Sequence, residues 1–183
     1  MESIEIGDIV KKEKFWPGIM ILENIQHISN GKIVYQEDNI KNILHVGGEQ
    51  QILNALFVGG PSTNTYIPTN YFLGLDNRST LSATDTLSSL VSEPSSGGYV
   101  RQGVSSTTGF TVQTSGTIVK ATTGIITFSC TTTSWGPVKN LFLTNVASGT
   151  AGVLYSSVAL SNTVTLAPGD SVTLKFSLSL SNC

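Results

Sequence analysis

The residues that most constrain the fold lie between positions 102 and 183, where charged side chains almost disappear. Only Lys120, Lys139, Asp170 and Lys175 are charged there, and Ser and Thr occupy the polar positions. Hydroxyl groups on small or β-branched residues suit strands better than helices. Residues 172–180 alternate, with apolar side chains at Val172, Leu174, Phe176, Leu178 and Leu180. This pattern predicts a half-buried strand with one solvated face.

Turn residues divide the same region at intervals near the roughly 8–12 residues typical of short antiparallel strands. They are Ser115-Gly116, Thr123-Gly124, Trp135-Gly136-Pro137, Ser148-Gly149, Ser161-Asn162 and Pro168-Gly169-Asp170. The strands that we expect are 99–104, 109–113, 117–121, 125–132, 138–146, 152–160, 163–166 and 171–180. These strands predict a mainly β fold. Their number and spacing favour an antiparallel β-sandwich, and the jelly roll is one form that such a sandwich can take.

The first part of the chain has a different pattern. Asn30-Gly31 separates two β-prone runs, 19–28 and 32–36, and predicts a β-hairpin, with 39–45 continuing extended. Apolar side chains then recur at Ile52, Leu53, Leu56 and Phe57, on one face of a short amphipathic helix that Gly59-Gly60 ends. A loop over 60–70 leads to an apolar strand over 71–75.

A second short helix is expected before the main strands. Ser82-Ala83-Thr84-Asp85 fits a capping box and precedes Leu87, Leu90 and Val91. We therefore divide the chain into an N-terminal arm, residues 1–20, and one sandwich domain, residues 21–183. In that domain, 21–60 form the hairpin and helix, and 70–183 form the main strands.

Charge and composition exclude several classes of function. Ten Lys and Arg against twelve Asp and Glu give a net charge of −2, which offers no basic field for nucleic acid or anionic lipid. No apolar run approaches the roughly 18 residues of a membrane span, and residues 1–18 show no secretory signal. Two His and two Cys fall short of a four-ligand zinc site, so we expect neither metal nor cofactor. We expect synthesis in a reducing cytoplasm, with Cys130 and Cys183 as free thiols; a disulfide between them is the less favoured alternative.

Catalytic chemistry has weak support. Asp85 and Glu93 could form an acid/base pair for glycoside hydrolysis, but structural roles are favoured. In those roles Asp85 caps a turn, and Glu93 or Asp76 pairs with Arg101. His27 and His45 are scattered and stand in no nucleophile or metal pattern. We expect a protein that is not an enzyme.

Three aromatic residues are candidates for contact with partners. Phe15 and Trp16 end the N-terminal arm, just before Pro17-Gly18, and we expect them to anchor the sandwich to a partner protein. Trp135 stands in a turn, where it either packs as a lid on the sandwich, the favoured interpretation, or contacts a glycan. The low charge of the surface favours close packing against neighbouring subunits, because interface centres are depleted of charged residues.

Several segments resemble a block found in structural proteins of tailed bacteriophages. They are 71–78 (YFLGLDNR), 81–87 (LSATDTL), Glu93-Pro94 and 98–102 (GYVRQ). Residues 135–143 (WGPVKNLFL) and 166–174 (LAPGDSVTL) are similar to later strands of the same proteins. The resemblance covers about residues 40–180, and the first 20 residues match nothing in it.

The resemblance implies a non-enzymatic component of a phage virion. The favoured role is a capsid-associated decoration or head-fibre-like protein, present as a homo-oligomer and attached through its N-terminal region. A neck or tail accessory protein and a carbohydrate-binding module that contacts a host-surface glycan are the alternatives. The expected partners are therefore other virion proteins, namely capsid, portal, neck or tail subunits, with a host glycan as the alternative ligand.

Overall fold

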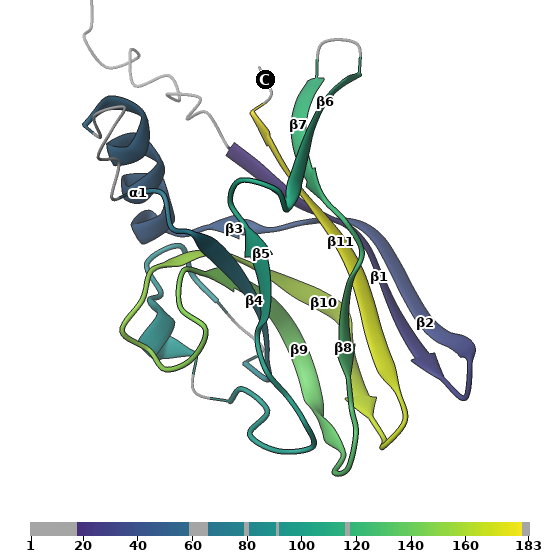
Figure 1. The fold of residues 1–183 in the computed structure, drawn as a ribbon. Coiled ribbons are helices and arrows are strands. Elements are labelled where there is room, and N and C mark those ends of the chain that lie inside the picture. Colours follow the sequence, from purple (N-terminus) through teal and green to yellow (C-terminus); the bar gives the residue numbers. More distant parts are fainter. Residues whose placement is uncertain (1–17, 59–65, 79–80, 91, 116–117, 181–183) are drawn as a thin grey trace, which may run out of the picture.

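The computed structural model describes residues 18–58, 66–78, 81–90, 92–115 and 118–180 (Figure 1). The elements in chain order are β1 (Gly18–Ser29), β2 (Lys32–Lys41), β3 (Ile43–Leu44), α1 (Val46–Phe57), β4 (Asn70–Asp76), the 3-10 turn η1 (Leu87–Ser89), β5 (Gln102–Ser105), β6 (Phe110–Ser115), β7 (Ile118–Thr123), β8 (Ile126–Ser129), β9 (Trp135–Thr144), β10 (Leu154–Leu166) and β11 (Ser171–Leu180). No helix among these residues is long and apolar enough to cross a membrane.

Two antiparallel sheets face each other, which confirms the predicted β-sandwich. The first sheet has the order β2-β1-β11-β7-β6, with β8 also paired to β11, and the second has the order β3-β10-β9-β4-β5. Figure 1 shows the two layers, with α1 and the β6–β7 hairpin projecting at the same end. The jelly-roll form stays a prediction, as does the division into an arm and one domain.

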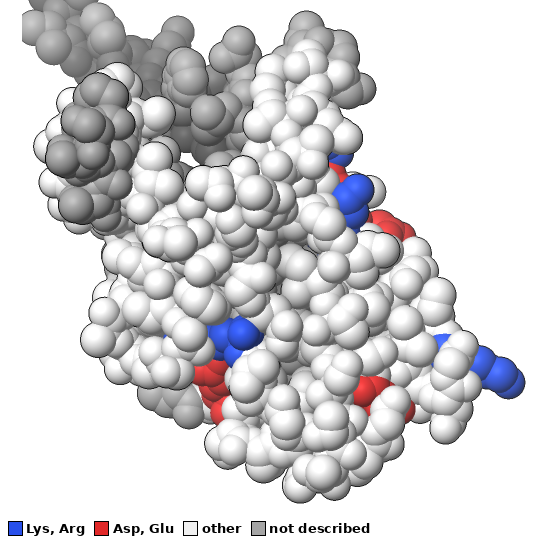
Figure 2. All heavy atoms as spheres, in the orientation of Figure 1, with Lys and Arg blue, Asp and Glu red and all other residues white. Residues whose placement is uncertain are grey.

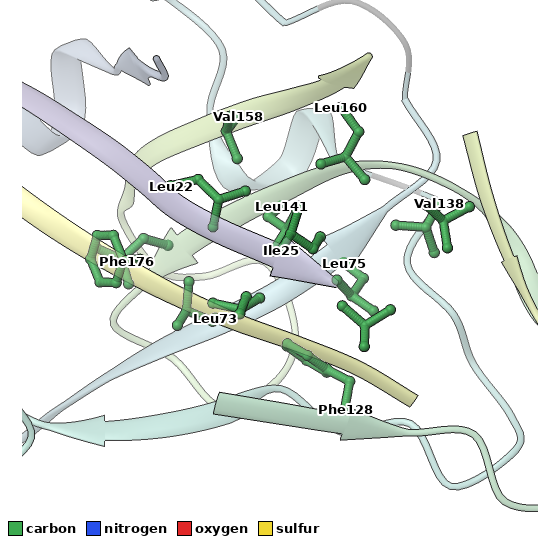
Figure 3. Close-up of a cluster of buried hydrophobic side chains, with 14 of the residues drawn as sticks. Leu22, Ile25, Leu73, Leu75, Phe128, Val138, Leu141, Val158, Leu160 and Phe176 are labelled. Carbon is green, nitrogen blue, oxygen red and sulfur yellow. The ribbon is translucent and has the colours of Figure 1, made fainter. Parts of the chain in front are cut away.

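Apolar side chains from both sheets meet in one core (Figure 3). Val172 and Leu174 of β11 are each 1% exposed and Phe176 is 4% exposed, as the alternation predicts. The opposite face of β11 is not uniformly solvated, however, because Ser177 and Ser179 are buried. Both hydroxyls have partners there: Ser177 bonds the Glu23 carboxylate, and Ser179 donates to the Val119 carbonyl (3.3 Å).

The first strand shows how a break in alternation is accommodated. Leu22 and Ile25 are both buried although three residues separate them. The register of β1 against β11 shifts between Leu22 and Asn24. Such a bulge returns the next apolar side chain to the core face. The predicted hairpin follows, with positive φ at Asn30 (50°) and Gly31 (72°).

The predicted turn at Ser161-Asn162 is wrong. Residues 152–160 and 163–166 do not form separate strands, because β10 runs continuously along β9 with an irregular register between Ala159 and Val164. The extra residues bulge from the sheet. Glu37 of β2 accepts the Ser161 N–H (3.1 Å) and hydroxyl and so holds this bulge.

The two helices also differ from expectation. The second is only the 3-10 turn η1, capped by Thr86, whose N–H donates to Ser89 Oγ (3.2 Å), rather than by Ser82. The first begins at Val46 and includes both glycines before Glu49. Gly48 lies so close to β10 that a Cβ on it would stand 2.5 Å from the Tyr155 carbonyl oxygen. A close helix–strand approach therefore explains a glycine that resembles a helix breaker.

Candidate functional site

An apolar pocket opens between the two sheets at the end of the sandwich that carries α1 and the β6–β7 hairpin. Its volume is about 390 Å³. We call it the apolar mouth; it is lined by Ile52, Tyr71, Ser106, Thr107, Phe110, Val112, Ala121, Leu143, Tyr155, Phe176 and Leu178. Residues from α1, both sheets and the β5–β6 connection therefore converge on one opening.

Four aromatic rings form the inner wall of this mouth. Tyr71 contacts Tyr155 edge-to-face, with ring centroids 5.3 Å apart, and contacts Phe110 in the same way at 5.9 Å. Phe110 in turn meets Phe176 at 6.0 Å. Such edge-to-face contacts hold rings in fixed orientations. The Tyr155 hydroxyl is buried with no hydrogen-bond partner among the described residues, and burial raises the pKa of that phenol.

The outer rim of the mouth is apolar and exposed. On α1, Leu56 lies one turn beyond Ile52 on the same helix face and is 64% exposed, while Phe57 is 79% exposed. We define the apolar rim as the exposed apolar residues of the two elements that flank the mouth, the end of α1 and the β6–β7 hairpin: Leu53, Leu56, Phe57, Val58, Val112 and Val119. Sequence periodicity identifies the apolar face of α1, but the structure leaves most of that face uncovered.

The rim carries almost no charge. Glu49 is the single charged residue of α1 and lies in its first turn. Figure 2 shows uncharged described atoms over α1 and over the outer part of the hairpin, with charged atoms nearer its base. On β7, Lys120 pairs with Glu23 of β1. An apolar, uncharged end of this kind is typical of a surface that another protein covers.

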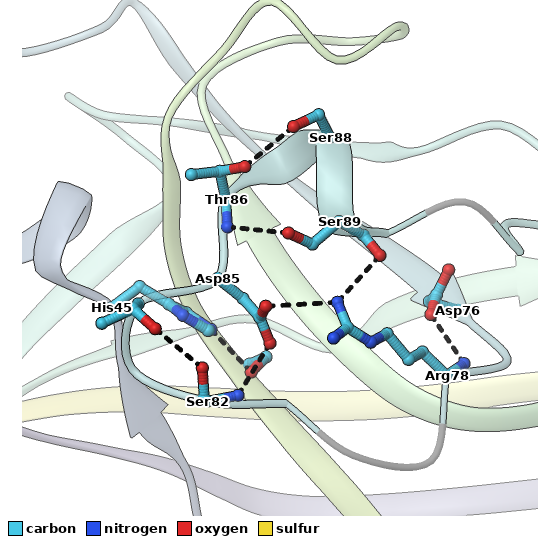
Figure 4. A network of polar contacts seen from close by, with 10 residues as sticks. His45, Asp76, Arg78, Ser82, Asp85, Thr86, Ser88 and Ser89 are labelled. Atoms are coloured by element: carbon cyan, nitrogen blue, oxygen red, sulfur yellow. Dashed lines mark hydrogen bonds and ion pairs between the residues drawn. The ribbon is translucent and has the colours of Figure 1, made fainter.

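A polar network holds the segment after β4 over the outer face of the second sheet (Figure 4). Asp76 is fully buried, and its carboxylate accepts the Arg78 N–H (2.7 Å). The Arg78 guanidinium donates to the Ser89 carbonyl (3.0 Å) and pairs with Asp85 (3.3 Å). Asp85 also accepts the Ser82 N–H (2.7 Å), and this bond, together with Arg78, lowers the pKa of Asp85. These contacts give Asp85 a structural role.

Glu93 pairs with Arg101 in a second polar network. The two side chains form a bidentate ion pair, Nε to Oε1 and Nη2 to Oε2, both 2.8 Å. Arg101 also donates to the carbonyls of Val146 (3.0 Å) and Gly149 (2.9 Å). The Tyr99 hydroxyl donates to Glu93 Oε1 (2.7 Å), and burial and the carboxylate raise the pKa of Tyr99. Of the two predicted partners for Arg101, Glu93 is therefore the one found.

Trp135 begins β9 and is 3% exposed. Its ring packs edge-to-face on Tyr99, with centroids 5.4 Å apart. It also borders a polar pocket of about 240 Å³ lined by Asn77, Ser92, Glu93, Pro94, Ser95, Ser96, Ser134, Gly136 and Pro137. This burial is what the packing interpretation expects. Contact between Trp135 and a glycan stays a prediction.

The histidines lie apart and have separate partners. His27 Nε2 lies 3.1 Å from an Asp170 carboxylate oxygen, and His45 Nε2 lies 2.8 Å from Ser157 Oγ. Burial lowers the pKa of His45. Within the described ranges, no three His, Cys, Asp or Glu side chains gather so as to hold a metal ion.

A family model described as podophage GP4 fiber I protein gp80 matches residues 44–179. The chain belongs to this fibre-protein family. The match runs from the end of β3 through β11 and includes α1, the apolar mouth and both polar networks. Comparison with curated proteins and with solved structures gave no match. The resemblance to tailed-phage structural proteins is thereby confirmed, and the chain is a structural virion component.

The structure describes only one of the remaining residues that the sequence singled out. Phe15, Trp16 and Cys183 lie outside the described residues. Cys130 is a buried free thiol, and burial raises its pKa. The sequence does not reveal the mouth, because alternation places Phe176 on the core face without showing that the space between the sheets opens at this end. The sequence feature that could have indicated an exposed apolar surface here is the run Leu56-Phe57-Val58, because consecutive apolar residues cannot all lie on the one buried face of a short helix.

Proposed function

We propose that this chain is a non-enzymatic fibre subunit of a tailed-phage virion, attached through its N-terminal region, residues 1–20. The favoured role is a capsid-associated, head-fibre-like protein, with the neck or tail as the alternative location. The family supports the structural role. The pairing of Asp85 with Arg78 and of Glu93 with Arg101 supports the absence of catalysis, because both carboxylates already serve the fold.

The observation that carries the attachment is the position of the apolar mouth relative to the start of β1. Gly18 pairs with Leu180, and Met20 pairs with Leu178, which lines the mouth. Phe15 and Trp16 precede Gly18 by three and two residues, so they are tethered within roughly 10 Å of chain from it. The proposed aromatic anchor therefore joins the fold at its apolar end.

Attachment is tested by replacing both anchor residues in the phage. Virions carrying Phe15→Ala and Trp16→Ala should lose the stoichiometric band of this protein on denaturing gels. A matched variant, Val34→Ala, changes an exposed apolar residue of β2 and should leave the band unchanged. Incorporation of the double variant at the wild-type copy number would contradict the proposal. Electron cryo-microscopy of wild-type virions distinguishes capsid from neck or tail.

A second candidate function is contact with a host glycan at the pocket beside Trp135. Its polar lining of serine hydroxyls, Asn77 and Glu93 favours this ligand class. Because Trp135 is buried, its removal would disturb the core, so Ser95→Arg is the better probe. Tryptophan fluorescence titrated with host polysaccharide should show binding that Ser95→Arg abolishes. A flat titration with the wild-type protein would dismiss this candidate.

A further inference from the structure

The apolar end of the sandwich carries both a projection and a hollow. The projection is the end of α1, where Leu56 and Phe57 stand exposed, and the hollow is the apolar mouth beside it. Ile52 lines the mouth from the same helix, so the two features are continuous. One copy of the chain therefore presents the two halves of an apolar contact at different positions.

We infer that this end is an interface between copies of this chain, in which Leu56 and Phe57 of one copy enter the apolar mouth of the next. The inference rests on the proposed function, in which several copies act together in a fibre. It adds the surface, the residues and the partner, which is a second copy. Tyr71, Phe110, Tyr155 and Phe176 would receive the Phe57 ring.

The dimensions and chemistry of the mouth fit this occupant. A volume of about 390 Å³ lies within the ~300–1,000 Å³ of pockets that hold small organic molecules, so an aromatic ring and a neighbouring leucine can enter. The aromatic wall offers edge-to-face partners to a further ring.

Charge also favours a second copy. A charged side chain that becomes buried in an apolar contact without a partner costs free energy. Glu49 lies in the first turn of α1, away from Leu56 and Phe57, and the lining of the mouth holds no charged residue, so the projection can enter the mouth without burying a charge. A basic or acidic partner would find no opposite charge at this end. An apolar partner would gain free energy by removing apolar surface from water.

The projection supplies part of the area that a stable contact requires. An exposed large apolar side chain offers on the order of 100 Å², so Leu53, Leu56, Phe57 and Val58 together offer on the order of 400 Å². A standard interface buries about 800 Å² on each partner, so the projection provides on the order of half of one partner's share. Because projection and hollow are different patches, the contact is heterologous and closes into a ring or extends as a filament.

The first experiment measures mass in solution. Light scattering of the purified full chain should give a multimer, and Leu56→Glu with Phe57→Glu should weaken association at least tenfold. Both residues are exposed, so the change leaves the fold intact, which circular dichroism checks. Val34→Glu is the matched control: Val34 is 59% exposed and lies on β2, a strand that contributes no lining residue to the mouth. It should assemble like the wild type.

The second experiment locates the contact. In a Cys183→Ser background, Phe57→Cys with Val112→Cys places one thiol on the projection and one at the mouth. Mild oxidation should give disulfide-linked dimers and higher ladders on non-reducing gels. Each single cysteine variant should remain monomeric on the same gel. A link within one chain instead of between chains would overturn the inference.

Each alternative occupant predicts a different result, and each would overturn the inference. The dye 8-anilinonaphthalene-1-sulfonate binds exposed apolar surface. If the wild-type protein is a monomer that binds this dye, the mouth is open and another virion protein is its occupant. A monomer that binds this dye only after deletion of residues 1–17 would assign the mouth to the chain's own N-terminal segment. These results do not depend on virion attachment, so failure of this interface and failure of the N-terminal anchor are distinguishable.

Discussion

At the scale of single residues, the charged side chains in the interior are structural. Arg101 is 4% exposed at its side chain and joins Glu93 to the carbonyls of Val146 and Gly149, so one guanidinium ties together two loops. Buried ion pairs contribute little against apolar replacements, but the loss of one partner leaves the other charge buried and unpaired. The network therefore specifies loop positions more than it adds stability.

Arg101→Ala should lower the free energy of unfolding by about 3 kcal/mol, because it removes the ion-pair partner of the partly buried Glu93, which then keeps the Tyr99 hydroxyl, and the donor to two carbonyls. Urea unfolding measures this change. Lys175→Ala is the control, since Lys175 is 45% exposed at its side chain and contacts Glu23 at 3.6 Å. Such an exposed pair is worth about 1 kcal/mol or less. Equal effects of the two variants would argue against the structural role of Arg101.

His45 should make stability depend on pH. Burial holds the pKa of His45 below its ordinary value of 6.5, so the unfolded chain takes up a proton near pH 6.5 while the folded chain stays neutral. His45 therefore makes its full contribution to the free energy of unfolding above pH 6.5, and this contribution falls as the pH drops toward the pKa of His45 in the folded protein. Urea unfolding at pH 7.5, 6.5 and 5.5 should show the fall, and His45→Gln should reduce it. An unchanged pH profile in the variant would refute this role.

At the scale of elements, α1 depends on two adjacent glycines with different environments. A Cβ on Gly48 would meet the Tyr155 carbonyl oxygen at 2.5 Å, whereas one on Gly47 would meet Val153 Cγ1 at 3.5 Å. The first distance is a clash with backbone and the second is an ordinary contact. The helix can therefore lie against β10 only with glycine at position 48.

Gly48→Ala should destabilise the protein by about 1–3 kcal/mol, the usual cost of overpacking. Gly47→Ala should be neutral or should stabilise the helix by up to about 1 kcal/mol, because alanine is the better helix former. Thermal unfolding followed by circular dichroism compares the two variants. If both lower the melting temperature equally, the contact between α1 and β10 is not as described.

At the scale of the whole molecule, the first and last described strands complete the sandwich together. β11 pairs with β1 on one side and with β7 and β8 on the other. It is therefore central to the first sheet and contributes Val172, Leu174 and Phe176 to the core. β1 contributes Leu22 and Ile25 to the core, whereas the proposed anchor residues Phe15 and Trp16 precede this strand, so folding and attachment can reside in different parts of the chain.

A chain that lacks residues 1–17 should fold with a cooperative thermal transition close to that of the full chain. A chain that lacks residues 171–183 should not fold, because β1, β7 and β8 lose their shared partner. Near-ultraviolet circular dichroism, which reports packed aromatic side chains, measures both. Loss of the near-ultraviolet signal on N-terminal deletion would show that the arm is part of the fold.

What the sequence determined by itself is the local structure: the alternation of β11, the hairpin at Asn30-Gly31, most of the strands between turns and the resemblance to phage structural proteins. These follow from spacing and from backbone preference, which act over a few residues. Tertiary structure alone decided which of Glu93 and Asp76 meets Arg101, that Gly48 touches β10 and that the face of α1 with Leu56 and Phe57 is uncovered. Periodicity shows which side chains share a face, but only the packing of distant segments determines whether anything covers that face.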